Sequence, residues 1–264
     1  PLKTHIKSKP EAEKAFFLFA GLGILIYFNS LGNGFVFDDN HYVSQNHLIK
    51  NLDILALKEI FSSFYKWDYL PLTHISLSVD YFLFGLNPMG YRITNISLHI
   101  VNAFLTYQLI LLVLGNKKIA LWTGLLFLVH PVNVESVAWI SERKNVLSLT
   151  FLLLSFIKYI QNKRTFSIFC FILACLSKST AIVLPILLIL YDSCFKPREF
   201  RKIIFDKWAF ALISFCLAGI TVLSHSQGQT LRTHPENNPL FSLYSMISVF
   251  REYWMKIALP INLN

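Results

Sequence analysis

Long apolar stretches alternate with short polar or basic segments along most of this chain. Apolar stretches of about 20 residues are typical of membrane-spanning helices, and shorter ones indicate tilted or broken spans. The pattern therefore predicts an all-α, polytopic membrane protein with about seven or eight transmembrane helices. The first seven stretches are residues 15–31, 93–114, 119–134, 146–160, 165–176, 181–194 and 208–224, and the eighth, residues 240–259, is interrupted by charged residues.

The segment between the first two long spans, residues 32–92, is too polar and too often interrupted by Gly and Pro to cross a membrane. Within it, residues 54–65 place apolar side chains at helical spacing opposite charged and polar ones. This arrangement predicts an interfacial helix that lies on the membrane surface. We therefore expect a long first external loop that carries interfacial helices and packs back against the membrane.

The composition agrees with an integral membrane protein, because 54% of the 264 residues are hydrophobic and 24 of them are Phe. The formal net charge of +9 comes from short basic clusters between apolar stretches, so we expect no nucleic-acid partner. Basic residues before the first span and at residues 196–207 place the N-terminus and that cluster in the cytoplasm. Alternation of the spans then places the polar loops around residues 38, 142, 178 and 225–239 on the extracytoplasmic side.

Residues 130–145, HPVNVESVAWISERKN, form a polar island between two apolar stretches. Ionisable groups at the edge of a bilayer are costly and are usually functional. If this island is one helix, Glu135, Trp139 and Glu142 share a face, with Arg143 beside them. Such a face could hold a polar ligand. The alternative is an ordinary loop outside the membrane.

An acidic pair, Asp38-Asp39, lies in the first external loop. One carboxylate could act as a general base while the other positions it; the alternative is an Asx-rich turn that ends the first helix. Three cations expected on the same side, Arg143, Lys144 and Lys178, predict an anion site suited to a phosphate carried on a lipid. We expect no metal site and no cofactor, since the chain has no phosphate-binding Gly-rich loop, GxSxG or HExxH motif, and its cysteines lack metal-ligand spacing.

A polar stripe runs along the span at residues 93–114, where Asn95, His99 and Asn102 recur at helical spacing. Such stripes commonly form hydrogen bonds between helices, and the alternative is that they line a substrate pocket. The candidate substrate pocket comprises His99, Asn102, His130, Glu135, Trp139 and Glu142.

Four blocks in the order FDDNHYVSQN, LPLTHISLSVDYFLFGLNPMGYRITNISLHIVNA, HPVNVESVAWISERKNVLS and LSKSTAIVLPILL resemble one known family. The chain is similar to the membrane region of the transmembrane-plus-tetratricopeptide O-mannosyltransferase-like proteins of the GT-C glycosyltransferase superfamily. The resemblance implies an inverting glycosyltransferase with a GT-C-like helical bundle. Such an enzyme transfers a sugar, typically mannose, from a polyprenyl-phosphate carrier to an extracytoplasmic hydroxyl, which we expect to be a protein Ser or Thr.

The resemblance also assigns residues. It matches Asp38 and Asp39 to the family's acidic motif, and Ser177 and Lys178 to its Ser-Lys turn. The third block is matched by His130, Pro131, Glu135, Ser136, Trp139, Glu142, Arg143 and Lys144. Phe37 stands where the family often has Trp, and Leu70 stands where some members have Arg.

Tetratricopeptide repeats follow the membrane region in this family and are absent from these residues. We therefore expect residues 1–264 to be a single membrane domain, truncated before further spans and repeats. We favour the bacterial inner membrane over the endoplasmic reticulum as its location. The alternative function is a non-catalytic protein that binds a lipid carrier or a transporter on the same scaffold, which should carry its polar groups near the membrane midplane.

Overall fold

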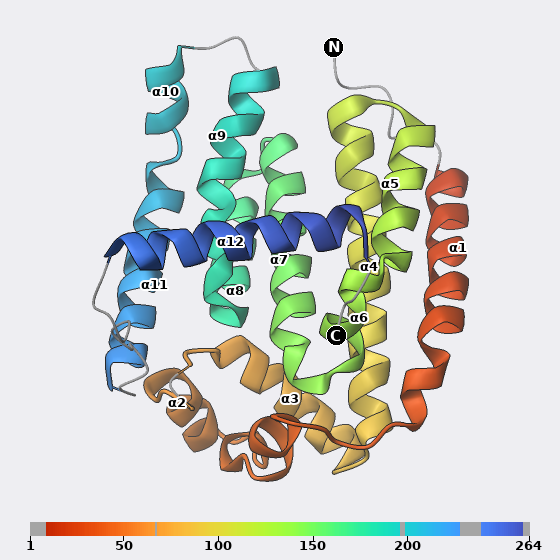
Figure 1. Ribbon diagram of the computed structural model, residues 1–264, viewed down its shortest axis with the longest axis vertical. Helices are drawn as coiled ribbons and strands as arrows, with labels where there is room; N and C mark the ends of the chain where they lie inside the picture. Colours follow the sequence, from red (N-terminus) through yellow and green to blue (C-terminus); the bar gives the residue numbers. More distant parts are fainter. Residues whose placement is uncertain (1–8, 67, 196–198, 228–238, 261–264) are drawn as a thin grey trace.

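The computed structural model describes residues 9–66, 68–195, 199–227 and 239–260. Within these ranges the chain forms α-helices and short 3-10 or π-helical turns joined by loops (Figure 1). The all-α class expected from the apolar pattern is confirmed. Each predicted apolar stretch lies largely on a helix: α1 (Lys9–Tyr27), α4 (Pro88–Leu114), α5 (Lys117–Val129), α7 (Arg143–Ile160), α8 (Arg164–Ser177), α9 (Leu184–Phe195), α11 (Trp208–Gln227) and α12 (Pro239–Ala258).

Helix α4 is central to the first half of the bundle and packs against α1, α5 and α7. The interface buries Phe19 of α1, Ala103 and Tyr107 of α4, and Leu128 of α5. Gly124 lets α5 approach this closely, because a Cβ there would lie 2.8 Å from the Phe19 ring and 3.1 Å from the carbonyl oxygen of Ala103. This tight packing fixes the helix that carries the polar stripe.

A second apolar cluster joins the later helices. Phe171 and Ala174 of α8, Leu184 and Leu188 of α9, and Phe210 of α11 are fully buried against one another. Helix α8 also packs along α7, and so connects this cluster to the first half of the bundle. A short 3-10 turn, η6 (Ser179–Val183), joins α8 to α9, and α10 (Phe200–Phe205) precedes α11.

The segment between α1 and α4, predicted to be the first external loop, gathers at one end of the bundle, below α7 and α8 in Figure 1. After η1 (Phe28–Gly32) it contains η2 (Asn40–Ser44), η3 (His47–Ile49), α2 (Ile54–Ser62) and α3 (Pro71–Phe84). The predicted helix at residues 54–65 is present as α2, which begins at an Asp53 cap whose carboxylate accepts the N–H of Ala56 (2.7 Å). Its interfacial position remains a prediction.

The polar island is not one helix, so the expected shared face of Glu135, Trp139 and Glu142 is wrong. It consists of η4 (Pro131–Asn133), α6 (Val134–Ala138) and η5 (Ile140–Glu142), followed by α7. Pro131 interrupts the helix because its ring disfavours helical backbone at the preceding residue, His130 (ψ 124°). Trp139 is also extended (ψ 119°), which turns the chain again before α7.

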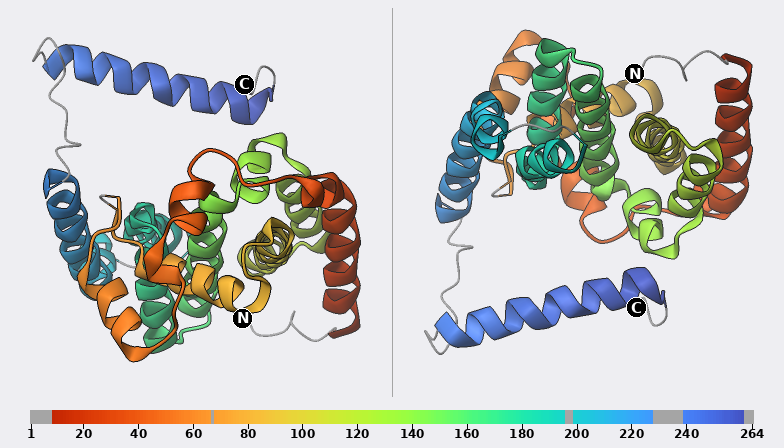
Figure 2. Two further views of the ribbon diagram at one scale, coloured as in Figure 1. Left: turned by 90° about the horizontal axis from the view of Figure 1, so that it is seen from below. Right: turned by 90° about the horizontal axis from the view of Figure 1, so that it is seen from above.

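Helix α12 runs crosswise to the upright helices in Figure 1, and the end-on views of Figure 2 show it standing away from the other helices. One hydrogen bond, 3.0 Å between Nε2 of His130 and the carbonyl oxygen of Ile257, joins its end to the polar island.

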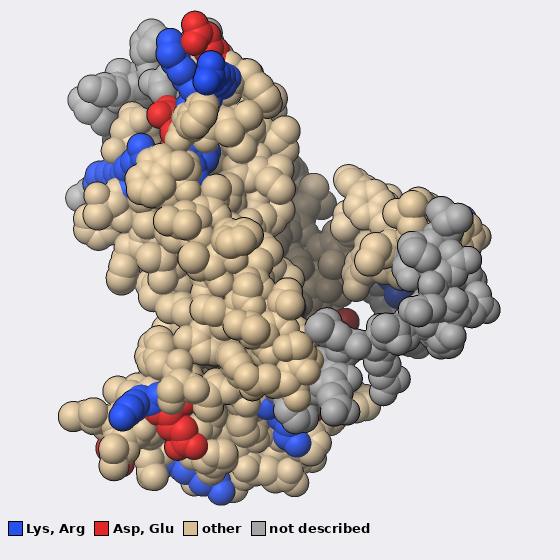
Figure 3. Space-filling view, turned by 90° about the vertical axis from the view of Figure 1, so that its left-hand side faces the viewer, with Lys and Arg blue, Asp and Glu red and all other residues tan. Residues whose placement is uncertain are grey.

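The described helices have the properties of a membrane protein. Three of them are long and apolar enough to cross a bilayer: α1 extended by η1, α4 and α11. Counting the pair from α5 to α6, which is bent by 51°, as one broken span raises this to four. Figure 3 shows charged residues at the two ends of the bundle and a broad uncharged belt between them. The count of seven or eight spans stays a prediction, because α8 and η6–α9 are apolar but shorter.

Candidate functional site

The two carboxylates of the acidic pair have different surroundings. Asp39 is fully buried, and its Oδ1 accepts hydrogen bonds from the backbone N–H (2.8 Å) and the hydroxyl (2.6 Å) of Ser141. Its Oδ2 accepts the N–H of Val36 (3.1 Å). Asp38 is exposed, and its carboxylate makes no hydrogen bond to the described part of the chain. Asp39 therefore ties the loop to the polar island, while Asp38 remains available to a ligand.

The residue before this pair has a strained backbone. Phe37 has φ 46°, a left-handed conformation that costs a bulky residue about 1–2 kcal/mol. Its ring is 82% exposed and meets Trp139 edge-to-face, with ring centroids 5.8 Å apart. Strain of this kind persists only where surrounding contacts hold it, and the bonds of Asp39 are such contacts.

Residues 141–144 send their side chains to four different parts of the molecule. The η5 turn and the first turn of α7 rotate successive side chains by about 100–120°. The partners are Asp39 for Ser141, two lysines for Glu142, Asp80 for Arg143 and the ring of Tyr42 for Lys144.

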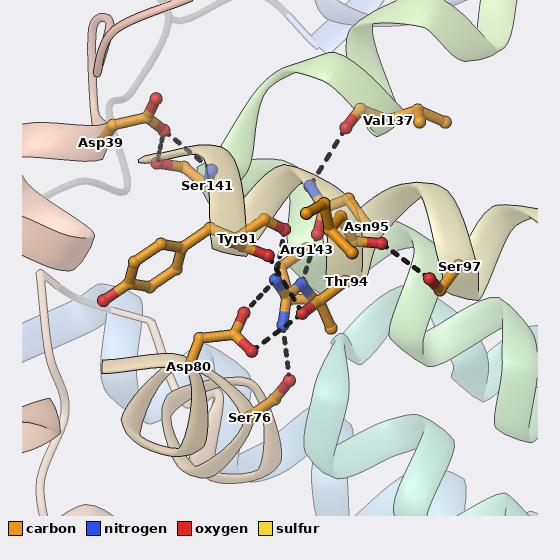
Figure 4. Close-up of polar contacts among 12 residues, drawn as sticks. Asp39, Ser76, Asp80, Tyr91, Thr94, Asn95, Ser97, Val137, Ser141 and Arg143 are labelled. Atoms are coloured by element: carbon orange, nitrogen blue, oxygen red, sulfur yellow. Dashed lines mark hydrogen bonds and ion pairs between the residues drawn. The ribbon is translucent and has the colours of Figure 1, made fainter. Parts of the chain in front are cut away.

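Arg143 lies in the protein core (Figure 4). Its Nη2 pairs with Oδ2 of Asp80 at 2.5 Å and donates to the carbonyl of Tyr91 at 2.8 Å. Its Nη1 donates to Ser76 (2.8 Å), and its Nε donates to Asn95. The guanidinium is fully buried and has partners at all three nitrogens, whereas the sequence led us to expect a cation exposed to a donor phosphate. In this structure Arg143 joins α3, α4 and α7.

Lys144 and Lys178 lie on either side of one carboxylate. The Nζ of Lys144 is 3.3 Å from Oε1 of Glu142, and the Nζ of Lys178 is 3.8 Å from its Oε2. Asn145 completes the group, since it accepts a hydrogen bond from Lys178 and donates to Glu142 and Ser136. Burial lowers the pKa of Lys178, and the negative charge of Glu142 opposes that shift.

Three residues beside this group could not be singled out from the sequence. The Tyr42 hydroxyl donates to Oδ2 of Asp68 (2.7 Å), and the Nζ of Lys144 lies 5.2 Å from the centre of the Tyr42 ring. His74 stacks on the same ring and is almost fully buried; burial lowers its pKa to about 4, so it is neutral at pH 7. Only the FDDNHY block hinted at Tyr42, and no pattern indicated Asp68.

The polar stripe on α4 lies between helices. Asn95, His99 and Asn102 are all buried. His99 contacts the carbonyl of Leu128 (3.1 Å), and Asn102 donates to the carbonyl of Val146 (2.8 Å). The stripe therefore forms hydrogen bonds between helices, one of the two readings open from the sequence. The structure does not bring His99 or Asn102 to the acidic pair.

The remaining pocket candidates lie on the side of the polar island that faces α12. Glu135 and Trp139 line a cavity of about 930 Å³ together with Phe37, Tyr253 and other residues of α12. The indole Nε1 of Trp139 is buried without a hydrogen-bond partner in the described residues. His130 lies beside this region and caps η4 by accepting the N–H of Val132 (3.2 Å).

The structure thus brings part of the predicted site together. The bonds from Asp39 to Ser141 place the acidic loop against the segment that carries Glu142 and Lys144, and Lys178 reaches the same segment from the end of α8. The set combines an exposed carboxylate with two partly buried ammonium groups. Such a set can accept a proton and bind an anion.

Comparison with known proteins gives a consistent result. The chain is 32% identical to human protein O-mannosyl-transferase TMTC3 over 164 residues, which are 57% of this chain and 17% of that protein. It is 34% identical to mouse protein O-mannosyl-transferase TMTC1 over 152 residues, 54% of this chain and 16% of the relative. A Caenorhabditis elegans protein O-mannosyl-transferase, F38B6.6, is 29% identical over 168 residues, 60% of this chain and 24% of the relative.

The matched segment is therefore less than a quarter of the length of each of these relatives. No family model matches the chain, and no solved structure matches it. Over somewhat more than half of its length, this chain is similar to the TMTC-like protein O-mannosyl-transferases, which confirms the family resemblance expected from its motifs.

Proposed function

We propose that this protein is an inverting membrane glycosyltransferase that transfers mannose from a polyprenyl-phosphate carrier to an extracytoplasmic Ser or Thr hydroxyl of a protein. The names of the relatives support a protein O-mannosyl transfer. The observation that carries the proposal is the exposed Asp38 on a loop that Asp39 fastens to the segment bearing Glu142 and Lys144.

In the proposed reaction, Asp38 accepts the proton of the acceptor hydroxyl as its oxygen attacks the anomeric carbon of the sugar. The carbon–oxygen bond to the phosphate breaks on the opposite face, which inverts the configuration. Lys144 and Lys178 bind the phosphate and stabilise the charge that it gains on departure. Asp39 positions its neighbour, and Arg143 holds the start of α7 from within the core.

The test is to supply purified protein in lipid nanodiscs with polyprenyl-phosphate mannose and a peptide rich in Ser and Thr. We expect a mannosylated peptide and free polyprenyl phosphate in equal amounts, with the α/β configuration of the new bond opposite to that of the donor. Retention of configuration would exclude the inverting mechanism. Absence of transfer would leave the alternative of a protein that only binds the carrier.

Replacement of Lys178 by Ala should weaken donor binding by about 2–5 kcal/mol, because the partly desolvated phosphate would lose a charged hydrogen-bond donor. Binding of a fluorescent donor analogue measures this effect. The matched control is Lys117→Ala at the other end of the bundle, where the lysine pairs with Glu11 on an exposed surface. If Lys178→Ala and the unmodified protein bound the donor analogue with equal affinity, Lys178 would not be part of the donor site.

The proposed fold is a GT-C-like bundle in which the shorter apolar helices also span the membrane in tilted or broken form, giving seven or eight spans. The proposed location is the bacterial inner membrane, with the N-terminus cytoplasmic and the site outside. The ends of the bundle support this orientation, since α10, in the basic cluster, lies at the end opposite α2 and α3 (Figure 1).

Cysteine labelling tests this orientation. We expect a Cys at position 200 in α10 to resist a membrane-impermeant reagent in intact cells and a Cys at position 54 in α2 to react, because Ile54 is 84% exposed. Cys194 and Cys216 are exposed and would first be replaced by Ser. Labelling at position 200 but not at position 54 would show that the orientation is opposite to the proposed one.

A further inference from the structure

A single carboxylate occupies the space between the two lysines of the proposed donor site. Glu142 lies 3.3 Å from Lys144 and 3.8 Å from Lys178. The three side chains are only 13%, 16% and 27% exposed, respectively, so these charges interact with limited screening by solvent.

The carboxylate of Glu142 is held in this place. Asn145 donates a hydrogen bond to it, and the same amide is fixed by Ser136 and by Lys178. Asp68 and Glu135 also act on Lys178 electrostatically, and Lys144 lies over the Tyr42 ring. Glu142 is nevertheless the one carboxylate among the described residues that pairs with both ammonium groups.

Glu142 therefore already balances one of the two positive charges that a ligand phosphate would meet. A sugar phosphodiester, the donor of the proposed reaction, carries one negative charge. A phosphate monoester carries about 1.5 to 2 negative charges at pH 7, because its second pKa is near 6. The second negative charge of a monoester would be repelled by Glu142 rather than paired.

We propose that Glu142 is a specificity-determining residue, which restricts the anion site between Lys144 and Lys178 to singly charged phosphodiesters and disfavours phosphate monoesters. This inference rests on the proposed function and deepens it. The lipid product of mannosyl transfer is a phosphate monoester, so Glu142 would also promote product release.

The test uses Glu142→Gln, which keeps the size of the side chain and an oxygen that can accept from Asn145 but removes the charge. The probes are a short-chain isoprenyl phosphate and the corresponding isoprenyl phosphoryl mannose, titrated separately onto the full chain in nanodiscs. We expect the substitution to tighten monoester binding about tenfold and diester binding less, so that the ratio of the two dissociation constants changes.

Two further variants make the outcome decisive. Lys144→Gln should change the ratio of the two dissociation constants in the opposite direction. This variant tests the inference if Glu142→Gln does not fold. Glu59→Gln changes the total charge equally on α2, where Glu59 is half-exposed and pairs with His47, and should leave the ratio as it is. An unchanged ratio in Glu142→Gln, an equal change in Glu59→Gln, or no binding of either probe would overturn the inference.

The transfer assay separates this result from the proposed function. If the protein transfers no mannose but the ratio of its monoester and diester dissociation constants depends on Glu142, it has the charge-selective site without the proposed activity. A protein that transfers mannose with a ratio insensitive to Glu142 would have the activity, and this inference would be wrong.

Discussion

Replacement of Asp38 by Asn should lower the rate of mannosyl transfer about 10² to 10⁴-fold, the usual contribution of a positioned general base. Asn has nearly the same shape as Asp but cannot take up the acceptor proton. Because Asp38 is exposed and its carboxylate makes no hydrogen bond within the described residues, the variant should fold and insert normally. Turnover measured with saturating donor gives the effect on the chemical step.

Two carboxylates provide controls for this experiment. Asp53→Asn removes an equal charge from the same segment between α1 and α4 and keeps a good helix cap, so transfer should be unaffected. Asp39→Asn should reduce transfer less than Asp38→Asn and should also lower stability, since its amide nitrogen cannot accept from Val36. If both single variants and the double variant turned over at the rate of the unmodified protein, the acidic pair would only form a turn and would have no catalytic role.

Replacement of Arg143 by Ala should destabilise the folded protein by about 3–5 kcal/mol, because Asp80 would remain charged and unpaired in the core. The carbonyl of Tyr91 and the amide oxygen of Asn95 would lose their donor as well. The expected result is a large fall in the unfolding temperature, measured in detergent by fluorescence or by monodispersity after heating.

The surface pair of Lys117 and Glu11 is the matched control, since both side chains are about half exposed. Lys117→Ala should cost at most about 1 kcal/mol. Combining Arg143→Ala with Asp80→Asn should recover part of the loss, because no unpaired charge then remains. If Arg143→Ala left stability unchanged and weakened donor binding, Arg143 would instead be a residue that binds the donor phosphate.

Most helices could be predicted from the sequence because an apolar stretch buries a face against a neighbour, as α4 does against α1 and α5. The number of helices that cross a membrane could not be predicted, since α8 and α9 are shorter than a straight span requires. Of the two readings of the polar island, a single helix or a loop, the single helix is wrong although the spacing fits a helical face. The backbone break at Pro131 and the extended residue Trp139 override that spacing.

The site was partly predictable for a similar reason. Alternating spans predicted one side for Asp38, Lys144 and Lys178. In the structure Asp39, the neighbour of Asp38, bonds to Ser141, and both lysines pair with Glu142. Sequence could not separate Arg143, directed into the core, from its neighbour Lys144, because adjacent residues in a helical turn point in different directions. Tyr42 and Asp68 were missed because their contact joins residues 26 positions apart in an irregular loop.

The four divergent side chains of residues 141–144 have a consequence for how this segment can evolve. A substitution there changes one contact, whereas an inserted or deleted residue rotates all four positions at once. The buried arginine would then leave Asp80, and the serine would leave Asp39. Relatives that keep this architecture should therefore differ from this chain by substitution within the segment and keep its length.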